Sequence, residues 1–220
     1  MSSPVDPVAA AYARWAPQYD HDQNYTRDLD AWVLREHGPD VRGREVLELG
    51  GGTGKNTHWL AERATHVRSV DLSPEMQALA RLKLAEAGVP DARVTFVTHD
   101  VRHPWPLDDE AVDLVVGNLV LEHVEDLAPI FAEAARVLRP GGTLWLAELH
   151  PERQRRGGQA HFVDPASGDP VYVPAFRHTV SEYVNGAIAA GLRVRRLGEW
   201  LEAGAAPDAP PRLFTMRAKR

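Results

Sequence analysis

A glycine cluster and one carboxylate are the residues whose types and spacing point most clearly to a chemical task. The stretch from Glu48 to Gly54 reads ELGGGTG and follows a short apolar run. Because glycine has no side chain, such a loop can turn sharply and approach a ligand closely. Asp71 stands 21 residues after Gly50, at the end of the next apolar run, where a carboxylate can accept both hydroxyls of a ribose. The pattern predicts a nucleoside-binding site.

The spacing of this loop excludes the two common phosphate-binding loops. A dinucleotide loop has the form Gly-x-Gly-x-x-Gly/Ala, and here Lys55 stands at the sixth position. A P-loop needs a glycine five residues before Gly54 and a Ser or Thr after Lys55, but Leu49 and Asn56 hold these places. A nucleotide-dependent oxidoreductase stays open as the enzymatic alternative.

The elements that must position these residues alternate between short apolar runs and amphipathic stretches from residue 45 to residue 146, which is typical of βαβ units. Helices are expected from Ser73-Pro74-Glu75 to about Ala87, over the apolar repeat that ends at Pro140-Gly141-Gly142, and over 179–190. Strands are expected at 45–49, 67–70, 94–98, 111–116, 143–149, 192–198 and 213–217. Together they predict one α/β domain.

Composition narrows the class of protein. At 220 residues the chain is long enough for one domain with a full core. Its formal net charge of −6 gives no basic field for nucleic acid. The absence of cysteine excludes disulfides and thiolate catalysis. No basic start or apolar segment marks a signal peptide or a membrane span. We therefore expect a cytoplasmic protein that binds neither nucleic acid nor membrane, while its oligomeric state is not predicted.

Five motifs, in order, resemble those of class I S-adenosylmethionine-dependent methyltransferases. They lie at Val46–Gly54, Val70–Met76, Thr98–Val101, Asp113–Asp126 and Leu138–Gly142. The chain is most similar to small-molecule enzymes of the ubiquinone and menaquinone C-methyltransferase type. One departure is Gly51, where the family usually has Cys, Ser or Ala. The resemblance implies S-adenosylmethionine as cofactor and a Rossmann-like three-layer α/β sandwich, whose seven-stranded sheet is mostly parallel with an antiparallel last strand.

The single domain of residues 1–220 is expected to divide into regions, of which the resemblance covers about residues 40–149. Residues 1–40 would form a helical N-terminal lid and 41–149 the cofactor-binding core. Residues 150–178, rich in Pro, Gly, His and Arg, would be an insertion on the substrate side. Residues 179–220 would complete the sheet.

The resemblance assigns cofactor-binding roles to residues of the lid and of four motifs. Tyr19 would cover the cofactor, Asp71 would bind the ribose, and Asp100 would accept the adenine amino group. The complete set is Tyr19, Glu48, Gly50, Gly51, Gly52, Thr53, Gly54, Asp71, Leu72, Met76, Asp100, Val101, Asn118 and Leu119.

A base is needed if the methylated atom of the acceptor carries a proton, and histidine suits this task near neutral pH. His150 is the first candidate because it ends a predicted strand, and the carboxyl ends of strands bind ligands in open α/β sheets. His123 and His178 are the other two candidates. No compact ligand spacing predicts a metal.

The acceptor is expected to be a small molecule. The segment Asn118–Leu121 lacks the Asn-Pro-Pro-Tyr type of motif that binds a flipped adenine or a planar amide. The sequence does not predict which atom is methylated. A non-catalytic S-adenosylmethionine-binding protein, which would lack an acceptor pocket, stays open as a second alternative.

Overall fold

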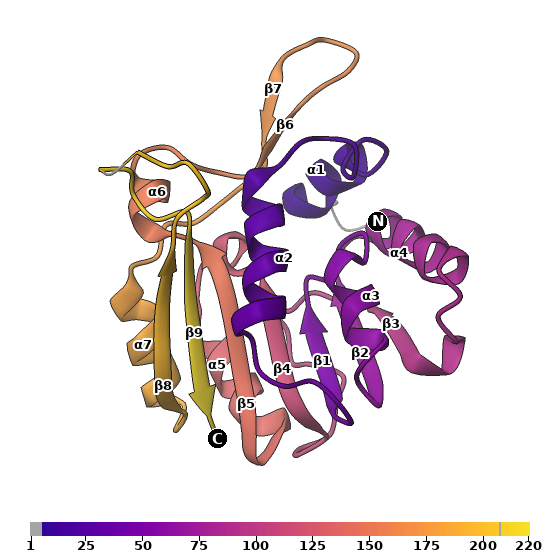
Figure 1. Ribbon diagram of the computed structural model, residues 1–220, viewed down its shortest axis with the longest axis vertical. Helices are drawn as coiled ribbons and strands as arrows, with labels where there is room; N and C mark the ends of the chain where they lie inside the picture. Colours follow the sequence, from indigo (N-terminus) through magenta and orange to yellow (C-terminus); the bar gives the residue numbers. More distant parts are fainter. Residues whose placement is uncertain (1–5, 207) are drawn as a thin grey trace, which may run out of the picture.

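A seven-stranded sheet in the order β3-β2-β1-β4-β5-β9-β8 forms the centre of the molecule (Figure 1). Strands β1 to β5 pair in parallel, whereas β9 runs antiparallel to both of its neighbours, β5 and β8. The predicted fold class is therefore confirmed. The strands are β1 (Glu45–Leu49), β2 (His66–Asp71), β3 (Val94–Thr98), β4 (Val112–Asn118), β5 (Leu138–Leu149), β8 (Arg193–Trp200) and β9 (Leu213–Lys219).

Helices cover both faces of the sheet because the central strands are apolar on both faces. In β1, Val46 packs with helices α2 and α3, whereas the next residue, Leu47, packs with α5 and α7 on the opposite face. Helix α4 contacts α3 and the outer strands β2 and β3. The helices are α2 (Tyr25–His37), α3 (Lys55–Ala61), α4 (Pro74–Glu86), α5 (Ala128–Val137) and α7 (Val180–Ala189).

Most helix boundaries follow the predicted signals, but one does not. The Ser73 Oγ accepts a hydrogen bond from the backbone N–H of Met76 and begins α4 as expected. Helix α5 was expected to continue to Pro140-Gly141-Gly142, yet it ends at Val137. Leu138 already has an extended backbone and pairs with Val112 of β4, so these residues belong to the start of β5.

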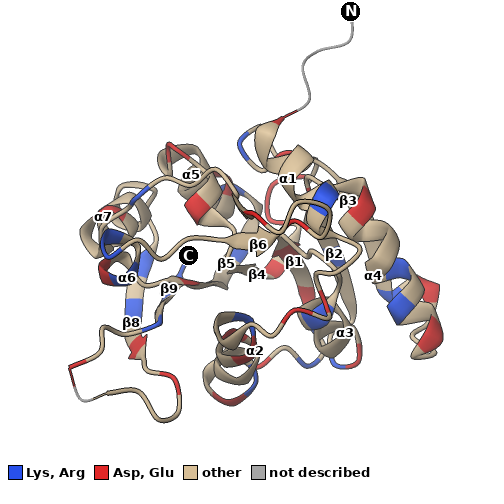
Figure 2. Cartoon of the chain, turned by 90° about the horizontal axis from the view of Figure 1, so that it is seen from above, with Lys and Arg blue, Asp and Glu red and all other residues tan. Residues whose placement is uncertain are grey.

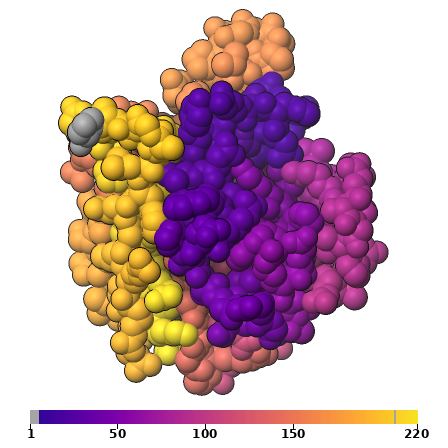
Figure 3. Space-filling view, viewed as in Figure 1, coloured from indigo at the N-terminus to yellow at the C-terminus, as the bar shows by residue number. Residues whose placement is uncertain are grey.

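The lid and the insertion meet above the carboxyl ends of the strands. Helix α1 (Pro7–Trp15) lies there, together with α6 (Pro151–Arg155) and a hairpin of β6 (His161–Val163) and β7 (Pro170–Tyr172) (Figures 1 and 3). Seen from above, β6 crosses over the ends of β1, β4 and β5 (Figure 2). Trp15 of the lid stacks on Phe162 of the insertion, with ring centroids 5.3 Å apart. Two 3₁₀ helices, η1 (Asp91–Arg93) and η2 (Leu121–His123), complete the elements.

This is a computed structural model, and it describes residues 6–206 and 208–220. The first five residues of the predicted lid lie outside this range, and they are half of the ten-residue stretch on which the signal-peptide prediction rests. Within the described ranges, no helix is long and apolar enough to cross a membrane.

Candidate functional site

A cavity of about 550 Å³ opens at the carboxyl ends of β1 and β4. From β1 the chain adds β2 and β3 on one side of the sheet and then returns to add β4 and β5 on the other side. Ligands of open α/β sheets bind at such a switch point, which here lies between β1 and β4. Every residue predicted to bind the cofactor lines this cavity, and so does His123. The fold thus brings the predicted cofactor residues together, while their individual roles stay predictions.

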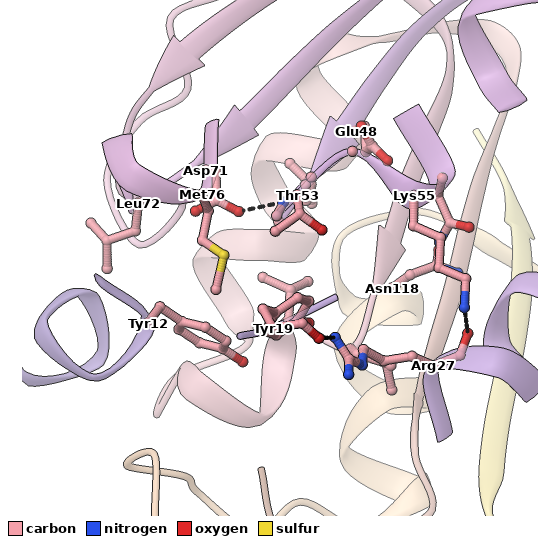
Figure 4. Close-up of a pocket in the computed structure, with 18 of the residues that line it drawn as sticks. Tyr12, Tyr19, Arg27, Glu48, Thr53, Lys55, Asp71, Leu72, Met76 and Asn118 are labelled. Atoms are coloured by element: carbon pink, nitrogen blue, oxygen red, sulfur yellow. Dashed lines mark hydrogen bonds between the residues drawn. The ribbon is translucent and has the colours of Figure 1, made fainter. Parts of the chain in front are cut away.

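The glycine loop and Asp71 hold each other in place (Figure 4). The backbone N–H of Gly52 donates to Asp71 Oδ2 at 2.7 Å, and the N–H of Ser73 donates to Oδ1 at 2.8 Å. Gly50 and Gly52 have φ angles of +68° and +53°, a region that favours glycine. Burial raises the pKa of Asp71, and the two backbone donors oppose this rise. The carboxylate therefore stands next to the loop, at the end of β2, as the spacing predicted.

Glu48 is buried under the loop. Its Oε2 accepts hydrogen bonds from Thr57 Oγ1 at 2.5 Å and from Ser69 Oγ at 2.9 Å. Burial raises the pKa of Glu48 to about 7, although both hydroxyl donors favour the charged form. These contacts show how Glu48 supports the loop from below, in addition to lining the cavity.

Another carboxylate of the cavity, Asp30 in α2, was not among the predicted site residues. It accepts a hydrogen bond from the Asn56 side chain at 3.0 Å and another from the Asn118 side chain. Burial raises its pKa to about 6, against the effect of these two donors. The sequence did hold a signal, because Asp30 lies three and four residues before the buried Val33 and Leu34, on the apolar face of the helix.

The lid closes one side of the cavity through Tyr19 and its neighbours (Figure 4). The guanidinium of Arg27 lies 4.0 Å from the centre of the Tyr19 ring and donates to the Tyr19 carbonyl. Asp20 accepts a hydrogen bond from Thr53 Oγ1 of the glycine loop at 2.7 Å and also pairs with Lys83. The lid is thus tied directly to the loop. Asp20 was missed because nothing near it in the sequence marks its contacts with Thr53 and Lys83, and Arg27 was missed because it belongs to no recognised motif.

Asp100 lies at the other end of the cavity, where the adenine was expected. Both of its carboxylate oxygens accept hydrogen bonds from Arg102, which also pairs with Asp6 of the lid. Burial alone would raise the pKa of Asp100, but the hydrogen bonds from Arg102 bring it below its usual value. Leu72, Met76 and Val101 supply apolar wall beside it.

The three candidate histidines are in different environments. His123 lines the cavity; its Nδ1 lies 2.7 Å from the Pro174 carbonyl and its Nε2 lies 2.9 Å from the Tyr12 hydroxyl. His150 does not line it: its Nδ1 accepts the N–H of Glu152 to cap α6, and its Nε2 meets Glu199. His150 was the first candidate for the base, but the structure does not place it beside the predicted cofactor residues.

His178 is also set apart from the cavity. It is buried, and its Nε2 lies 2.8 Å from the Val124 carbonyl. Across the described part of the chain, no group of three His, Cys, Asp or Glu side chains is placed to hold a metal ion.

A second cavity of about 350 Å³ adjoins the first. The two share Tyr12, Tyr19 and Leu119 among their lining residues. The insertion contributes Gly157 to His161 and Tyr172 to the second cavity only. Buried Glu122, next to His123 in the chain, also lines it, and burial raises the pKa of Glu122 to about 7.

Comparisons with known proteins agree with this geometry. A family model described as a methyltransferase domain matches residues 47–146. The chain is 32% identical to an uncharacterized methyltransferase of Emericella nidulans, over 84% of this chain and 75% of the relative. It is 31% identical to a demethylmenaquinone methyltransferase of Clavibacter sepedonicus, over 74% of this chain and 65% of that protein. Some other relatives are longer, and the chain spans about half their length.

A solved structure supports the same assignment. An S-adenosylmethionine-dependent methyltransferase from Mesorhizobium loti superposes with a TM-score of 0.68 at 26% identity, covering 86% of this chain and 96% of that one. The chain therefore belongs to the S-adenosylmethionine-dependent methyltransferases, and S-adenosylmethionine is its cofactor.

Proposed function

We propose that the chain transfers the methyl group of S-adenosylmethionine to a small-molecule acceptor in the second cavity, with His123 as the base. The observation that carries this proposal is the pair of adjoining cavities that share Tyr12, Tyr19 and Leu119. One cavity contains the predicted cofactor residues, and the other is lined in part by the insertion. Because a non-catalytic binding protein needs no acceptor cavity, the second cavity favours an enzyme over that alternative.

The residues of the first cavity fit S-adenosylmethionine in their chemistry. Asp71 would accept the ribose hydroxyls, with Leu72 and Met76 beside the adenine. Asp30 is a buried carboxylate on the cavity wall, suited to a cationic ligand group such as the ammonium or sulfonium of the cofactor. Positive φ angles in the loop keep the backbone open to a closely approaching ligand.

The cofactor, when bound, supplies a methyl group on a positively charged sulfur, which is already activated for displacement. The remaining task of the protein is to orient the acceptor, to exclude water and to take up a proton where one is released. The lid and the insertion lie over the site and pack on each other through Trp15 and Phe162, which limits the access of water.

His123 is arranged to accept a proton. The Pro174 carbonyl can only accept, so Nδ1 of the neutral ring carries the hydrogen. The lone pair of Nε2 is then free to accept from the Tyr12 hydroxyl. Burial lowers the pKa of His123, so the ring stays neutral near pH 7. An acceptor hydroxyl or amine that takes the place of the Tyr12 hydroxyl would pass its proton directly to Nε2. One that donates a hydrogen bond to the Tyr12 oxygen would pass its proton to Tyr12, whose own proton would move to Nε2.

The test compares His123→Gln and Tyr12→Phe with the wild-type chain, using labelled cofactor and a panel of small phenols, amines and heterocycles. His66→Gln is the control, since His66 lies at the start of β2 and lines neither cavity. For an acceptor with a dissociable proton, we expect His123→Gln to lower kcat by about 100-fold or more. Affinity for S-adenosylhomocysteine, measured by calorimetry, should stay unchanged. Full activity of His123→Gln would refute the base, and a panel with no methylated product would refute the small-molecule acceptor.

A further inference from the structure

The second cavity is lined by three arginines that come from three different elements. Arg27 belongs to α2, Arg153 to α6, and Arg212 directly precedes β9. Since these elements are far apart in the sequence, only the folded chain brings their guanidinium groups to one cavity. Their charges are the feature of this cavity that neither the methyl transfer nor the proposed base uses.

Carboxylates balance these charges only in part. Arg153 and Arg212 share a single partner, Glu202, which meets Arg153 Nη2 with its Oε1 and Arg212 Nη2 with its Oε2. Arg27 donates to the backbone carbonyls of Tyr19 and Asp22 and, within the residues that the structure describes, has no carboxylate partner. Positive charge is therefore in excess at the cavity wall.

Arg153 has the donor that is open to a ligand. Its Nη2 is occupied by Glu202, whereas its Nη1 has no hydrogen-bond partner in the described part of the chain and is not among the buried unpaired atoms. By contrast, Arg212 has both terminal nitrogens engaged, one with Thr26 Oγ1 at 2.9 Å and one with Glu202. Arg153 is thus the guanidinium that can bind an anion directly, with Arg212 holding Glu202 beside it.

The one carboxyl group that lines this cavity does not cancel the excess at neutral pH. Burial raises the pKa of Glu122 to about 7, so a large share of it is protonated there. The remaining walls include aromatic side chains of the lid and the hairpin, at Tyr12, Trp15, Tyr19, Tyr25 and Tyr172. The cavity therefore combines an apolar body with a cationic end.

From this arrangement we propose that the acceptor is a small organic acid whose carboxylate binds Arg153 while its apolar part packs against the lid aromatics. The inference rests on the proposed function only in taking the second cavity as the acceptor site. Arg153 is then a specificity-determining residue, because a neutral analogue of the acid would leave its guanidinium without a partner.

The experiment measures binding by calorimetry in the presence of S-adenosylhomocysteine, so that it does not depend on turnover. The probes are 4-hydroxybenzoate and 4-hydroxyphenylacetate, each paired with its neutral primary amide. The variants are Arg153→Gln and, as control, Arg155→Gln. Arg155 lies in the same helix but is exposed and outside the cavity lining.

We expect the wild-type chain to bind at least one acid about tenfold or more tightly than its amide. Arg153→Gln should remove this preference, and Arg155→Gln should keep it. Equal affinity for acids and amides in the wild-type chain overturns the proposal, and this result does not depend on whether Arg153→Gln folds. An acid preference that survives in folded Arg153→Gln also overturns it. Absence of binding by both acids at 10 mM also overturns it.

The two proposals fail in different ways. Acid binding that depends on Arg153, with no methyl transfer to any acceptor, refutes the proposed function and supports the anion site. Methylation of neutral acceptors alone, with His123→Gln inactive, supports the proposed function and refutes the anion site.

Discussion

The backbone of Gly51 passes so close to Ser69 that a Cβ atom on residue 51 would lie 2.0 Å from the Ser69 Oγ. That hydroxyl donates to Glu48 at 2.9 Å, beneath the glycine loop. Related methyltransferases were expected to carry Cys, Ser or Ala at position 51. In this chain the side chain of Ser69, reaching up from β2, occupies the space that such a residue would need. The glycine at position 51 and the serine at position 69 therefore depend on each other, because the Ser69 side chain fits only when residue 51 has no Cβ.

We predict that Gly51→Ala destabilises the protein by about 1–3 kcal/mol, because the added methyl group must displace the Ser69 side chain from its contact with Glu48. The double variant Gly51→Ala/Ser69→Ala removes the obstructing hydroxyl and should recover most of this loss. Urea unfolding of the two single variants and the double variant gives the coupling energy of the pair. Additive effects, with a coupling energy near zero, would contradict this account.

The parts of the fold that follow local rules could be predicted from the sequence. Strand β1 was predicted at Glu45–Leu49 and is found there, because an apolar run that ends in glycines is a local pattern. Helix α4 likewise begins after Ser73, whose side chain caps it. The lining residues from the glycine loop, from Asp71 to Met76, from Asp100 to Val101 and from Asn118 to Leu119 could be predicted for the same reason, since each belongs to a motif at a strand end.

Residues whose roles depend on distant partners could not be predicted in this way. Asp20 acts through Thr53 of the glycine loop, and Asp30 through two asparagines on other elements. His150 was preferred for its place at a strand end, but in the fold its ring caps α6 and meets Glu199 on β8. The sequence predicted that His150 lies at the end of a strand, but it did not predict the direction in which its side chain points. The hairpin β6–β7 was missed because its strands have only three residues each.

We predict that Asp71→Ala weakens S-adenosylhomocysteine binding by at least about tenfold, or about 1.4 kcal/mol. The substitution removes the expected acceptor of the ribose hydroxyls. It also leaves the Gly52 N–H without its partner at 2.7 Å, so the loop loses part of its support. Calorimetric titration measures the affinity directly.

Two further variants separate these effects of Asp71. Asp71→Asn keeps an oxygen for the Gly52 N–H and should lose less affinity than Asp71→Ala. Asp91→Ala, on an exposed residue of η1, is the control and should bind as the wild-type chain does. An unchanged affinity in Asp71→Ala would remove the ribose assignment.

The last prediction concerns Glu148, a buried carboxyl at the end of β5. Its Oε1 accepts from the backbone N–H of Leu121 at 3.1 Å and of Val120 at 3.3 Å, while its Oε2 has no partner among the described residues. Burial, with a smaller contribution from the nearby Glu122, raises the pKa of Glu148 well above 4.5. The folded protein therefore favours the protonated form, and the resulting stability is complete below about pH 4.5 and is lost as pH rises through the folded pKa.

Glu148→Gln should therefore be more stable than the wild-type chain at pH 8, by a margin that shrinks toward pH 5. The amide oxygen can still accept from Leu121 and Val120, and glutamine carries no charge at any pH. Urea unfolding at pH 5 and pH 8 gives the difference in unfolding free energy between variant and wild type. Comparing differences cancels the titration of groups that do not interact with Glu148. Glu125→Gln, on an exposed residue, should show no such trend, and a Glu148→Gln difference that is flat with pH would show that this carboxyl does not titrate as its burial requires.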